Sequence, residues 1–331
     1  MIPPEGITMD EPIKRWMAAI VLSFILPQAV VNLGSSMMAT PDAEPTTPST
    51  TPIEIEEPFK IPVLIDGSTI TFLDLEEYVR GVVLAEVPAY FEADALSAQA
   101  VAARTYAMRR IFLKDRHRYG AVCTDHTCCQ AWISDEDYLA QRGGKKDLEK
   151  VTAAVTQTAG QVLTFGGKLA ETTYFSCSGG QTEDAFAVWG ESIHYLQSQP
   201  SPGEEYAAGY EQQLHFTPAD FSDALGLSLS GDPSQWFGPA TYTEGGGVAT
   251  MVIGDVSYSG TTLRTLLGLN STLFSITTDG DTITVTAKGH GHRVGMSQYG
   301  ANAMAMQGRA FDEILAYYYP GTVIDKLSDV E

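Results

Sequence analysis

Hydrophobic residues recur at helical spacing between Asp74 and Val87. The apolar stripe consists of Leu75, Tyr78, Val79, Val82 and Val83. Asp74 can cap this helix, and Glu77 stands at the third helical position, from which a glutamate can reach back to the cap. Pro88 disfavours helical geometry in the residue before it, so the pattern predicts a helix that ends close to Glu86.

A second helix is predicted from about residue 93 to residue 114. It is rich in Ala and Leu, with Gln99 and Arg104 among small or apolar neighbours. Two such helices would pack closely around Glu86. A carboxyl group sheltered by apolar packing has a raised pKa, which suits a general acid. The alternative is an ordinary solvated residue at a helix end, since acidic residues are common there.

Further along the chain, short elements follow one another without a repeating strand-helix-strand pattern. We expect a hairpin of 63–65 and 68–72, a helix over 147–159 before Gly160, and a hairpin of 161–165 and 168–175. A helix starting at Thr217-Pro218, strands over 251–258 and 274–286, and a short helix over 262–267 complete the pattern. This order predicts an α+β fold, a single mixed globular domain with a substrate groove.

Residues 1–59 differ in pattern from the rest of the chain. Residues 1–13 are short and polar, and 14–34 combine Lys14-Arg15 with an apolar run just long enough to cross a bilayer. We interpret this run as an uncleaved membrane anchor in preference to a removed signal peptide, with residues 1–13 cytoplasmic and the bulk of the chain extracytoplasmic. Residues 35–59 are rich in Thr, Pro and Glu and predict an extended linker, so the catalytic domain would span 60–331.

Composition narrows the function classes. The chain has 331 residues, of which 44% are hydrophobic, and a formal net charge of −21. This charge argues against nucleic acid and against docking on anionic lipid headgroups, because both would repel the protein. An uncharged or weakly charged glycan remains compatible as a substrate.

Cysteine and histidine side chains gather in one loop. His117, Cys123, His126, Cys128 and Cys129 lie within thirteen residues and offer enough ligands for a tetrahedral zinc site. The alternative is a disulfide between Cys123 and Cys128 or Cys129, as in many exported proteins. We favour zinc, because a disulfide leaves one cysteine and both histidines of the loop unused. Four protein ligands leave no open position, so the role would be structural.

Two later segments carry polar groups suited to a ligand. The run from Ser176 to Trp189 is rich in hydroxyls and glycines; it could bind a polar ligand or be an ordinary glycine turn beside a buried Trp189. Cys177 within it is interpreted as a small buried residue, because no basic partner stands nearby. Ser297 and Gln298 could contact sugar hydroxyl and acetamido groups.

Other chemistries fit the sequence less well. His290 and His292 could bind a metal ion as a pair of ligands, but no acidic residue lies at a spacing that would supply a third ligand. We therefore prefer roles in substrate binding or in fixing the backbone. A Ser-His hydrolase lacks both the Gly-x-Ser-x-Gly turn and a third member.

The run EYVRGVVLAEVPAYFEADALSAQAVAARTYA resembles the signature of the stage II sporulation protein D family. SCSGGQT, VWG and GHGHRVGMSQYGA resemble further family motifs, although Arg293 stands where the family has a second glycine. Members of this family are lytic transglycosylases of the cell wall and amidase enhancers. In some members two histidines and two cysteines of the corresponding loop bind zinc. The resemblance assigns this role to His117, Cys123, Cys128 and Cys129; Cys128 replaces a histidine, and His126 could take its place.

This resemblance implies a membrane-anchored lytic transglycosylase. Glu86 would cleave the bond between N-acetylmuramic acid and N-acetylglucosamine and yield 1,6-anhydro products from strands without stem peptides, during engulfment of the forespore. Arg104 could stabilise developing charge or hold the glycan if the two helices form a hairpin, with Ser297 and Gln298 as further substrate contacts. Implied partners are peptidoglycan strands, a cell-wall amidase or endopeptidase and a membrane scaffold protein of the engulfment machinery. The alternative function is a non-catalytic, glycan-binding enhancer of an amidase.

Overall fold

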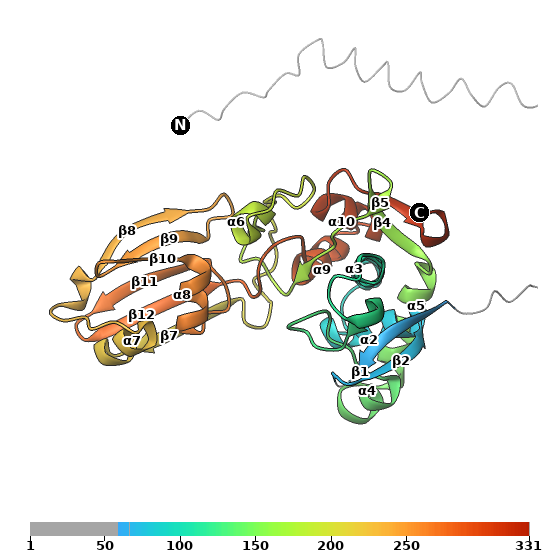
Figure 1. The fold of residues 1–331 in the computed structure, drawn as a ribbon, viewed down its shortest axis with the longest axis horizontal. Coiled ribbons are helices and arrows are strands. Elements are labelled where there is room, and N and C mark those ends of the chain that lie inside the picture. The colour runs from blue at the N-terminus through green and yellow to red at the C-terminus, as the bar shows by residue number, and fades with distance from the viewer. Residues whose placement is uncertain (1–58, 66, 331) are drawn as a thin grey trace, which may run out of the picture. The chain divides into compact units, whose positions relative to one another are not determined.

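The computed structural model describes residues 59–65 and 67–330. They form a mixed α+β fold with several small sheets, in agreement with the predicted fold class (Figure 1). The predicted membrane anchor and most of the linker lie outside the described residues. Among the residues that are described, no helix is long and apolar enough to span a bilayer.

The two predicted N-terminal helices are confirmed and pack against each other. Helix α2 spans Leu75–Glu86 and helix α3 spans Ala93–Leu113. The side chain of Asp74 caps α2 by accepting hydrogen bonds from the backbone N–H groups of Glu76 and Glu77, at 2.9 and 3.1 Å. The apolar stripe of α2 is buried in a core that it shares with α3 and with helix α5 (Lys145–Gln157). These helices form the scaffold around the end of α2.

Small sheets surround this helical scaffold. The predicted first hairpin is confirmed as β1 (Lys60–Ile65) and β2 (Thr69–Asp74), and β3 (Val122–Cys123) adds to β1 in parallel. A second sheet has the order β14-β4-β5, with bounds Val323–Lys326, Gln161–Phe165 and Lys168–Leu169. The segment between β3 and β4 contains helix α4 (Asp135–Gln141).

The sequence predicts one continuous strand over 168–175, and this prediction is wrong because the structure divides the segment into two strands. Only β5 pairs with β4, and the chain then leaves the hairpin. It pairs again as β6 (Tyr174–Phe175), which lies parallel to β13 (Met296–Ser297). The alternating pattern did not reveal this change of partner, because β6 finds its partner strand more than a hundred residues further along the chain.

The polar 298–319 region forms two helices that pack on α3. Helix α9 spans Gln298–Met306 and α10 spans Phe311–Tyr318. Helix α6 is a single turn over Ala185–Trp189, and short 3-10 turns occur at Arg118–Gly120, Pro233–Gln235 and Leu327–Asp329. A second core under α10 includes Ile314, Leu315 and Tyr318.

Residues 211–288 form a β-rich part with a core of its own, drawn mainly in yellow and orange in Figure 1. One sheet has the order β10-β9-β8, with bounds Val256–Ser259, Val248–Ile253 and Phe237–Tyr242. The other has the order β11-β12-β7, with bounds Phe274–Asp279, Thr282–Lys288 and Glu211–Phe216. Helices α7 (Pro218–Leu225) and α8 (Gly260–Leu267) pack against each other and on these sheets. The predicted strand over 251–258 is thus two strands of a hairpin.

Arg293, which replaces a glycine of the family motif, keeps the backbone conformation of a glycine. Its φ is +67°, in the left-handed region that non-glycine residues seldom adopt. The side chain has no exposed surface and pairs with Glu183, which is equally buried. These contacts offset the strain of the turn.

Candidate functional site

Glu86 is the last residue of α2, as the sequence predicts. Val87 leaves the helix in an extended conformation, with φ −128° and ψ 149°, ahead of Pro88. The Glu86 side chain is half-buried, and its Oε1 atom accepts a hydrogen bond of 2.8 Å from the backbone N–H of Ala131. The end of one helix and a loop more than forty residues away therefore fix the position of this carboxyl group.

Burial raises the pKa of Glu86 above its ordinary value of 4.5. The Ala131 N–H, the Gln298 side chain and the charge of His126 act in the opposite direction but are outweighed. The amide Nε2 of Gln298 is itself buried without a hydrogen-bond partner, so its influence comes from its closeness to the carboxyl group. Glu86 can therefore hold a proton at a higher pH than an exposed glutamate, as a general acid must.

Glu86 lines two cavities. The larger has a volume of about 760 Å³ and extends from α2 to the cysteine loop and the β6 segment. Trp189 is 41% exposed and forms part of its wall, with its ring centroid 5.5 Å from that of His292. Trp189 is thus not buried, in contrast to the alternative in which this segment is an ordinary glycine turn beside a buried tryptophan. An exposed aromatic face in a polar cavity can stack on a sugar ring.

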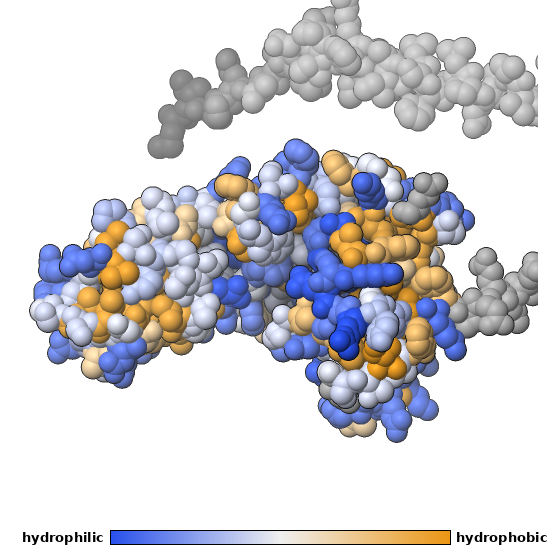
Figure 2. All heavy atoms as spheres, viewed as in Figure 1, coloured by the Kyte–Doolittle hydropathy of each residue, from blue (hydrophilic) through white to orange (hydrophobic). Residues whose placement is uncertain are grey.

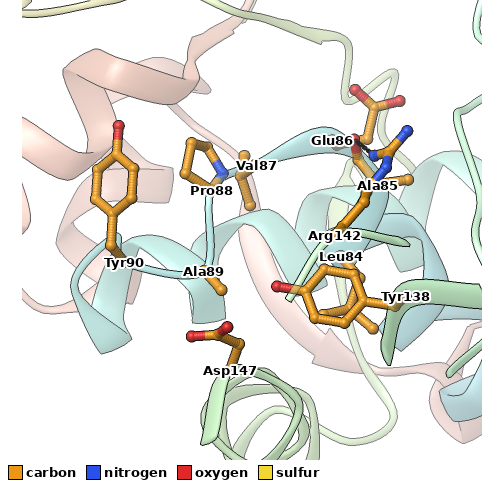
Figure 3. A pocket seen from close by; sticks show the side chains of 10 residues that line it. All are labelled: Leu84, Ala85, Glu86, Val87, Pro88, Ala89, Tyr90, Tyr138, Arg142 and Asp147. Carbon is orange, nitrogen blue, oxygen red and sulfur yellow. Dashed lines mark hydrogen bonds between the residues drawn. The ribbon is translucent and has the colours of Figure 1, made fainter. Parts of the chain in front are cut away.

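The smaller cavity also includes Glu86 in its lining and has a volume of about 460 Å³ (Figure 3). It is lined by Leu84, Ala85, Glu86, Val87, Pro88, Ala89, Tyr90, Tyr138, Arg142 and Asp147. Tyr90 is 66% exposed, and its hydroxyl lies 3.4 Å from that of Tyr299. Glu86 is the one residue common to the linings of these two cavities, and we refer to the two cavities together as the groove and to each of them as one of its arms.

Other carboxylates line the groove, but most are already engaged. Glu171 pairs with Arg109 at 3.0 Å and with Arg110. Asp147 accepts a hydrogen bond of 2.9 Å from the Gly144 N–H at the start of α5. Glu191 lines the larger cavity without an ion pair in the part of the chain that the structure describes.

The cysteine loop brings four ligand atoms together. The ligand atoms of His117, Cys123, Cys128 and Cys129 all lie within 4.8 Å of one another. The His117 Nε2 atom is 3.3 Å from the sulfur of Cys128 and 3.6 Å from that of Cys129. All four cysteines of the chain are free thiols in the structure. His126 is exposed and is not part of the group.

This loop is joined directly to Glu86, which the sequence did not reveal. Gln130 follows Cys129 and is buried, with its amide Nε2 donating a 2.6 Å hydrogen bond to the Tyr174 hydroxyl and its Oε1 accepting one of 3.3 Å from Tyr78. Ala131, the next residue, donates to Glu86. The only signal in the sequence was that Gln130 and Ala131 directly follow the pair Cys128-Cys129.

The structure does not place Arg104 in the groove. Its side chain has no exposed surface, and its guanidinium forms an ion pair of 2.5 Å with Glu76 and donates to the Gln161 carbonyl at 3.0 Å. Glu76 lies in the first turn of α2, about 15 Å along the helix from its last residue, Glu86. Arg104 therefore joins α2, α3 and β4, and the predicted glycan contact is wrong because a side chain without exposed surface cannot touch a polymer.

The structure separates the roles predicted for Ser297 and Gln298. Ser297 is fully buried and caps α9, where its hydroxyl accepts a 3.1 Å hydrogen bond from the Gly300 N–H. A direct contact with substrate is therefore excluded in this conformation. Gln298 lines the larger cavity beside Glu86 and remains available to a ligand.

The remaining predicted polar residues take supporting positions. Burial lowers the pKa of His292 to about 4, so its imidazole is neutral, and its Nδ1 accepts a 3.1 Å hydrogen bond from the Val294 N–H. His290 lines the same cavity, and neither histidine belongs to a metal-type cluster among the described residues. Cys177 is buried, as expected, and burial raises its pKa to about 11.

Comparison with known proteins places this architecture in a family. Residues 66–165 match the family model described as SpoIID, stage II sporulation protein. The chain is 40% identical over 301 residues to stage II sporulation protein D of Bacillus subtilis (strain 168), covering 88% of this chain and 87% of the relative. It is 39% identical over 293 residues to the protein of the same name from Bacillus amyloliquefaciens, with 87% and 83% covered.

A further relative has a different name. The amidase enhancer of Bacillus subtilis (strain 168) is 30% identical over 304 residues, which cover 74% of this chain and 40% of that protein. The two sporulation proteins match at higher identity and over nearly their whole lengths. The chain therefore belongs to the stage II sporulation protein D family.

Proposed function

We propose that this protein is a lytic transglycosylase that cuts peptidoglycan glycan strands, with Glu86 as its general acid and base. The observation that carries the proposal is a half-buried carboxyl group of raised pKa at the meeting point of two groove arms. Membership in a family of sporulation proteins supports a substrate in the cell wall.

The reaction requires one group that gives and then takes a proton. Glu86 protonates the glycosidic oxygen between N-acetylmuramic acid and N-acetylglucosamine as the bond to the muramoyl C1 breaks. The resulting carboxylate then accepts the proton of the muramoyl C6 hydroxyl, whose oxygen bonds to C1. The products are a 1,6-anhydromuramoyl end and a free N-acetylglucosamine hydroxyl, and no water is consumed.

One carboxyl group suffices because the substrate supplies its own nucleophile. Hydrolases that use two carboxylates need the second as nucleophile or to activate water. Glu171 and Asp147, which share the groove with Glu86, are already held by arginines and by a helix end. Their engagement supports a reaction in which Glu86 acts alone.

We propose further that His117, Cys123, Cys128 and Cys129 bind a structural zinc ion. Their donor atoms fit a zinc ion, because a tetrahedral zinc with Zn–S bonds of about 2.3 Å places its ligand atoms within about 4 Å of one another. Bound zinc would cross-link the loop and would take no part in the reaction. The loop in turn carries Ala131 to Glu86.

Elemental analysis of the purified protein, together with thiol titration, tests the zinc site. Stoichiometric zinc with three loop thiols protected from modification is the expected result. A zinc-free preparation whose loop thiols are oxidised would show that the loop is closed by a disulfide instead.

Residues 14–34 lead us to propose a single-pass protein of the cell membrane whose catalytic domain lies outside the cytoplasm. A cell-wall amidase or endopeptidase that removes stem peptides, and a membrane scaffold protein of forespore engulfment, are the partners that this placement suits. Protease treatment of intact cells tests it, because digestion should remove the groove and leave residues 1–13 protected.

The decisive experiment is digestion of peptide-free glycan strands by the full-length protein and by Glu86→Gln. Wild type should release products with 1,6-anhydromuramoyl ends, detected by mass spectrometry, and Glu86→Gln should release none. Equal product from both proteins would show that Glu86 is not the catalytic residue.

The relative named amidase enhancer favours a second candidate function, a glycan-binding protein that stimulates an amidase without cleaving glycan itself. In that case both wild type and Glu86→Gln would bind strands without cutting them. Both would also raise the rate at which an added amidase acts, which separates this function from the first.

A further inference from the structure

The smaller arm of the groove contains a cation that lacks an acidic partner. Arg142 lies at the end of α4, is exposed, and lines the smaller cavity together with Glu86 (Figure 3). Within the described residues, its side chain makes one hydrogen bond, a long contact of 3.4 Å to the backbone carbonyl of Ala85. No ion pair involving Arg142 occurs within the described residues.

Most other arginines of the described chain are committed to carboxylates. Arg80, Arg104, Arg109, Arg110, Arg293 and Arg309 each form an ion pair. The whole chain carries a net charge of −21, so acidic partners are abundant. Arg116 in the larger cavity and Arg142 in the smaller one are the arginines that line these cavities without an ion pair to a described residue, so each is free to bind an acidic ligand.

The acids nearest to Arg142 do not neutralise it. Asp147 lines the same cavity but lies beyond ion-pair distance of Arg142, and its carboxylate accepts the Gly144 N–H at the start of α5. A carboxylate at a helix N-terminus is stabilised where it stands. Glu86 keeps its proton more readily than an exposed glutamate because it is desolvated.

The arm also offers a surface for a sugar ring next to this charge. Tyr90 exposes 66% of its surface, and its hydroxyl is held near that of Tyr299. Its ring also packs edge-on against Phe91, at a centroid distance of 5.4 Å. Figure 3 shows Pro88 and Ala89 between Tyr90 and Arg142 along the wall of this cavity.

The space-filling view agrees with a polar binding face. Figure 2 shows strongly hydrophilic residues gathered over α3 and the loop that follows it, next to hydrophobic surface.

We propose that Arg142 binds the lactyl carboxylate of a muramoyl residue in this arm and thereby selects strands without stem peptides. The proposal rests on the proposed function. Muramic acid differs from glucosamine by its lactyl ether, whose carboxyl group is free in a stripped strand and is an amide where a peptide is attached. A guanidinium binds a carboxylate through two charge-assisted hydrogen bonds, and an amide cannot reproduce them.

The test measures binding, so that it does not depend on cleavage. Full-length Glu86→Gln is titrated with peptide-free glycan strands and with the same strands after carbodiimide coupling of their carboxylates to methylamine. We expect the free strands to bind about tenfold more tightly, the usual value of a hydrogen-bonded charge pair. Adding salt should reduce this preference, because the pair is exposed.

Arg142→Gln in the same background should bind both strands equally, and Arg142→Lys should keep part of the preference. Arg309→Gln is the matched control, because Arg309 is an exposed arginine that lines a different cavity. It should retain the full preference. Thermal unfolding of each variant checks that the fold is kept, and Arg142→Lys remains informative if Arg142→Gln does not fold.

Equal binding of the two strands by the Glu86→Gln protein would overturn the proposal, and so would a preference that survives in Arg142→Gln. These outcomes differ from failure of the proposed function. A protein that cuts no glycan but loses its carboxylate preference in Arg142→Gln would still support Arg142 as the selecting residue. A protein that cuts free and amidated strands equally well would be a transglycosylase without this selection.

Discussion

The chemistry proposed for Glu86 depends on the balance of a few contacts around one carboxyl group. Loss of water raises its pKa, whereas one backbone N–H, one amide and one exposed histidine lower it. Burial prevails because α2 ends against a loop that covers one side of the carboxyl group. Its exposed side faces the groove, where a substrate oxygen can reach the proton.

The pH profile of glycan cleavage should report this balance. The protonated form of Glu86 starts the reaction, so kcat/KM should be high at low pH and fall as the pH rises through the raised pKa. Measuring kcat/KM on peptide-free strands against pH should give a falling limb above the ordinary glutamate value of 4.5. A falling limb at or below 4.5 would show that the carboxyl group is solvated in the working enzyme.

Stability should change in the same sense as activity and fall as the pH rises. The folded pKa of Glu86 is raised, so the folded state binds more protons than the unfolded state, and the fold loses stability as the pH rises from the unfolded pKa to the folded one. Glu86→Gln removes this cost and keeps an oxygen for the Ala131 N–H. Denaturant unfolding should show the variant at least as stable as wild type near neutral pH, with the difference shrinking in acid.

Glu191 provides the test of whether Glu86 acts alone. It lines the larger cavity and lacks an ion pair within residues 59–65 and 67–330. Glu191→Gln should leave both the rate and the 1,6-anhydro product unchanged, since the muramoyl hydroxyl is the nucleophile. Loss of activity, or wild-type products that are hydrolysed rather than anhydro, would indicate a mechanism with two carboxylates.

At the scale of elements, the site depends on how closely α2 approaches the loop after the cysteines. Gly81 has no side chain on the helix face that meets this loop, and its carbonyl accepts a 3.2 Å hydrogen bond from the Ile133 N–H. A Cβ added to Gly81 would lie 2.3 Å from the Trp132 Nε1 atom and 2.6 Å from the Ile133 carbonyl oxygen. The glycine therefore lets the loop reach the helix that carries Glu86.

Gly81→Ala should consequently damage the site without touching the groove. Displacing Trp132 also moves Ala131, so the hydrogen bond to Glu86 is weakened. We expect a loss of about 1–3 kcal/mol in unfolding free energy and a fall in kcat of roughly 10–100-fold. Gly144→Ala is the matched control, because its Cβ would meet nothing closer than 4.0 Å. A Gly81→Ala enzyme with full kcat would show that this approach is not needed for catalysis.

At the scale of the whole molecule, buried ion pairs join segments that are distant in sequence. Arg293 donates to the carbonyls of Ser178, Gln181 and Gly245, at 2.8, 2.8 and 2.6 Å, in addition to its pair with Glu183. One side chain thus connects the glycine-rich segment after β6, the turn between β8 and β9, and the segment before β13. A glycine at this position could not make these contacts.

Arg293→Ala should therefore destabilise the fold by about 3–5 kcal/mol, because it leaves the buried charge of Glu183 without a partner. Chemical denaturation measures the change. The double variant Arg293→Ala with Glu183→Gln should recover part of the loss, since no charge then remains buried. A single variant as stable as wild type would mean that water or another group replaces the guanidinium.

The sequence by itself determined the local elements and the residue at the centre of the site. Helix α2, its cap at Asp74 and its end at Glu86 follow from side-chain spacing and from Pro88, because helix geometry and capping act over a few residues. The closeness of His117, Cys123, Cys128 and Cys129 in sequence likewise predicts that they gather in one loop, whereas only the structure separates His126 from this group.

Only the tertiary structure decided which residues reach the groove. Arg104 and Ser297 are buried and bonded within the fold. In contrast, the backbone of Ala131 donates to Glu86, and Arg142 lines a cavity with Glu86. The change of partner at β6 was equally hidden. The physical reason is that burial, ion pairing and strand pairing depend on contacts between distant segments, and a residue's type does not state which segment will cover it.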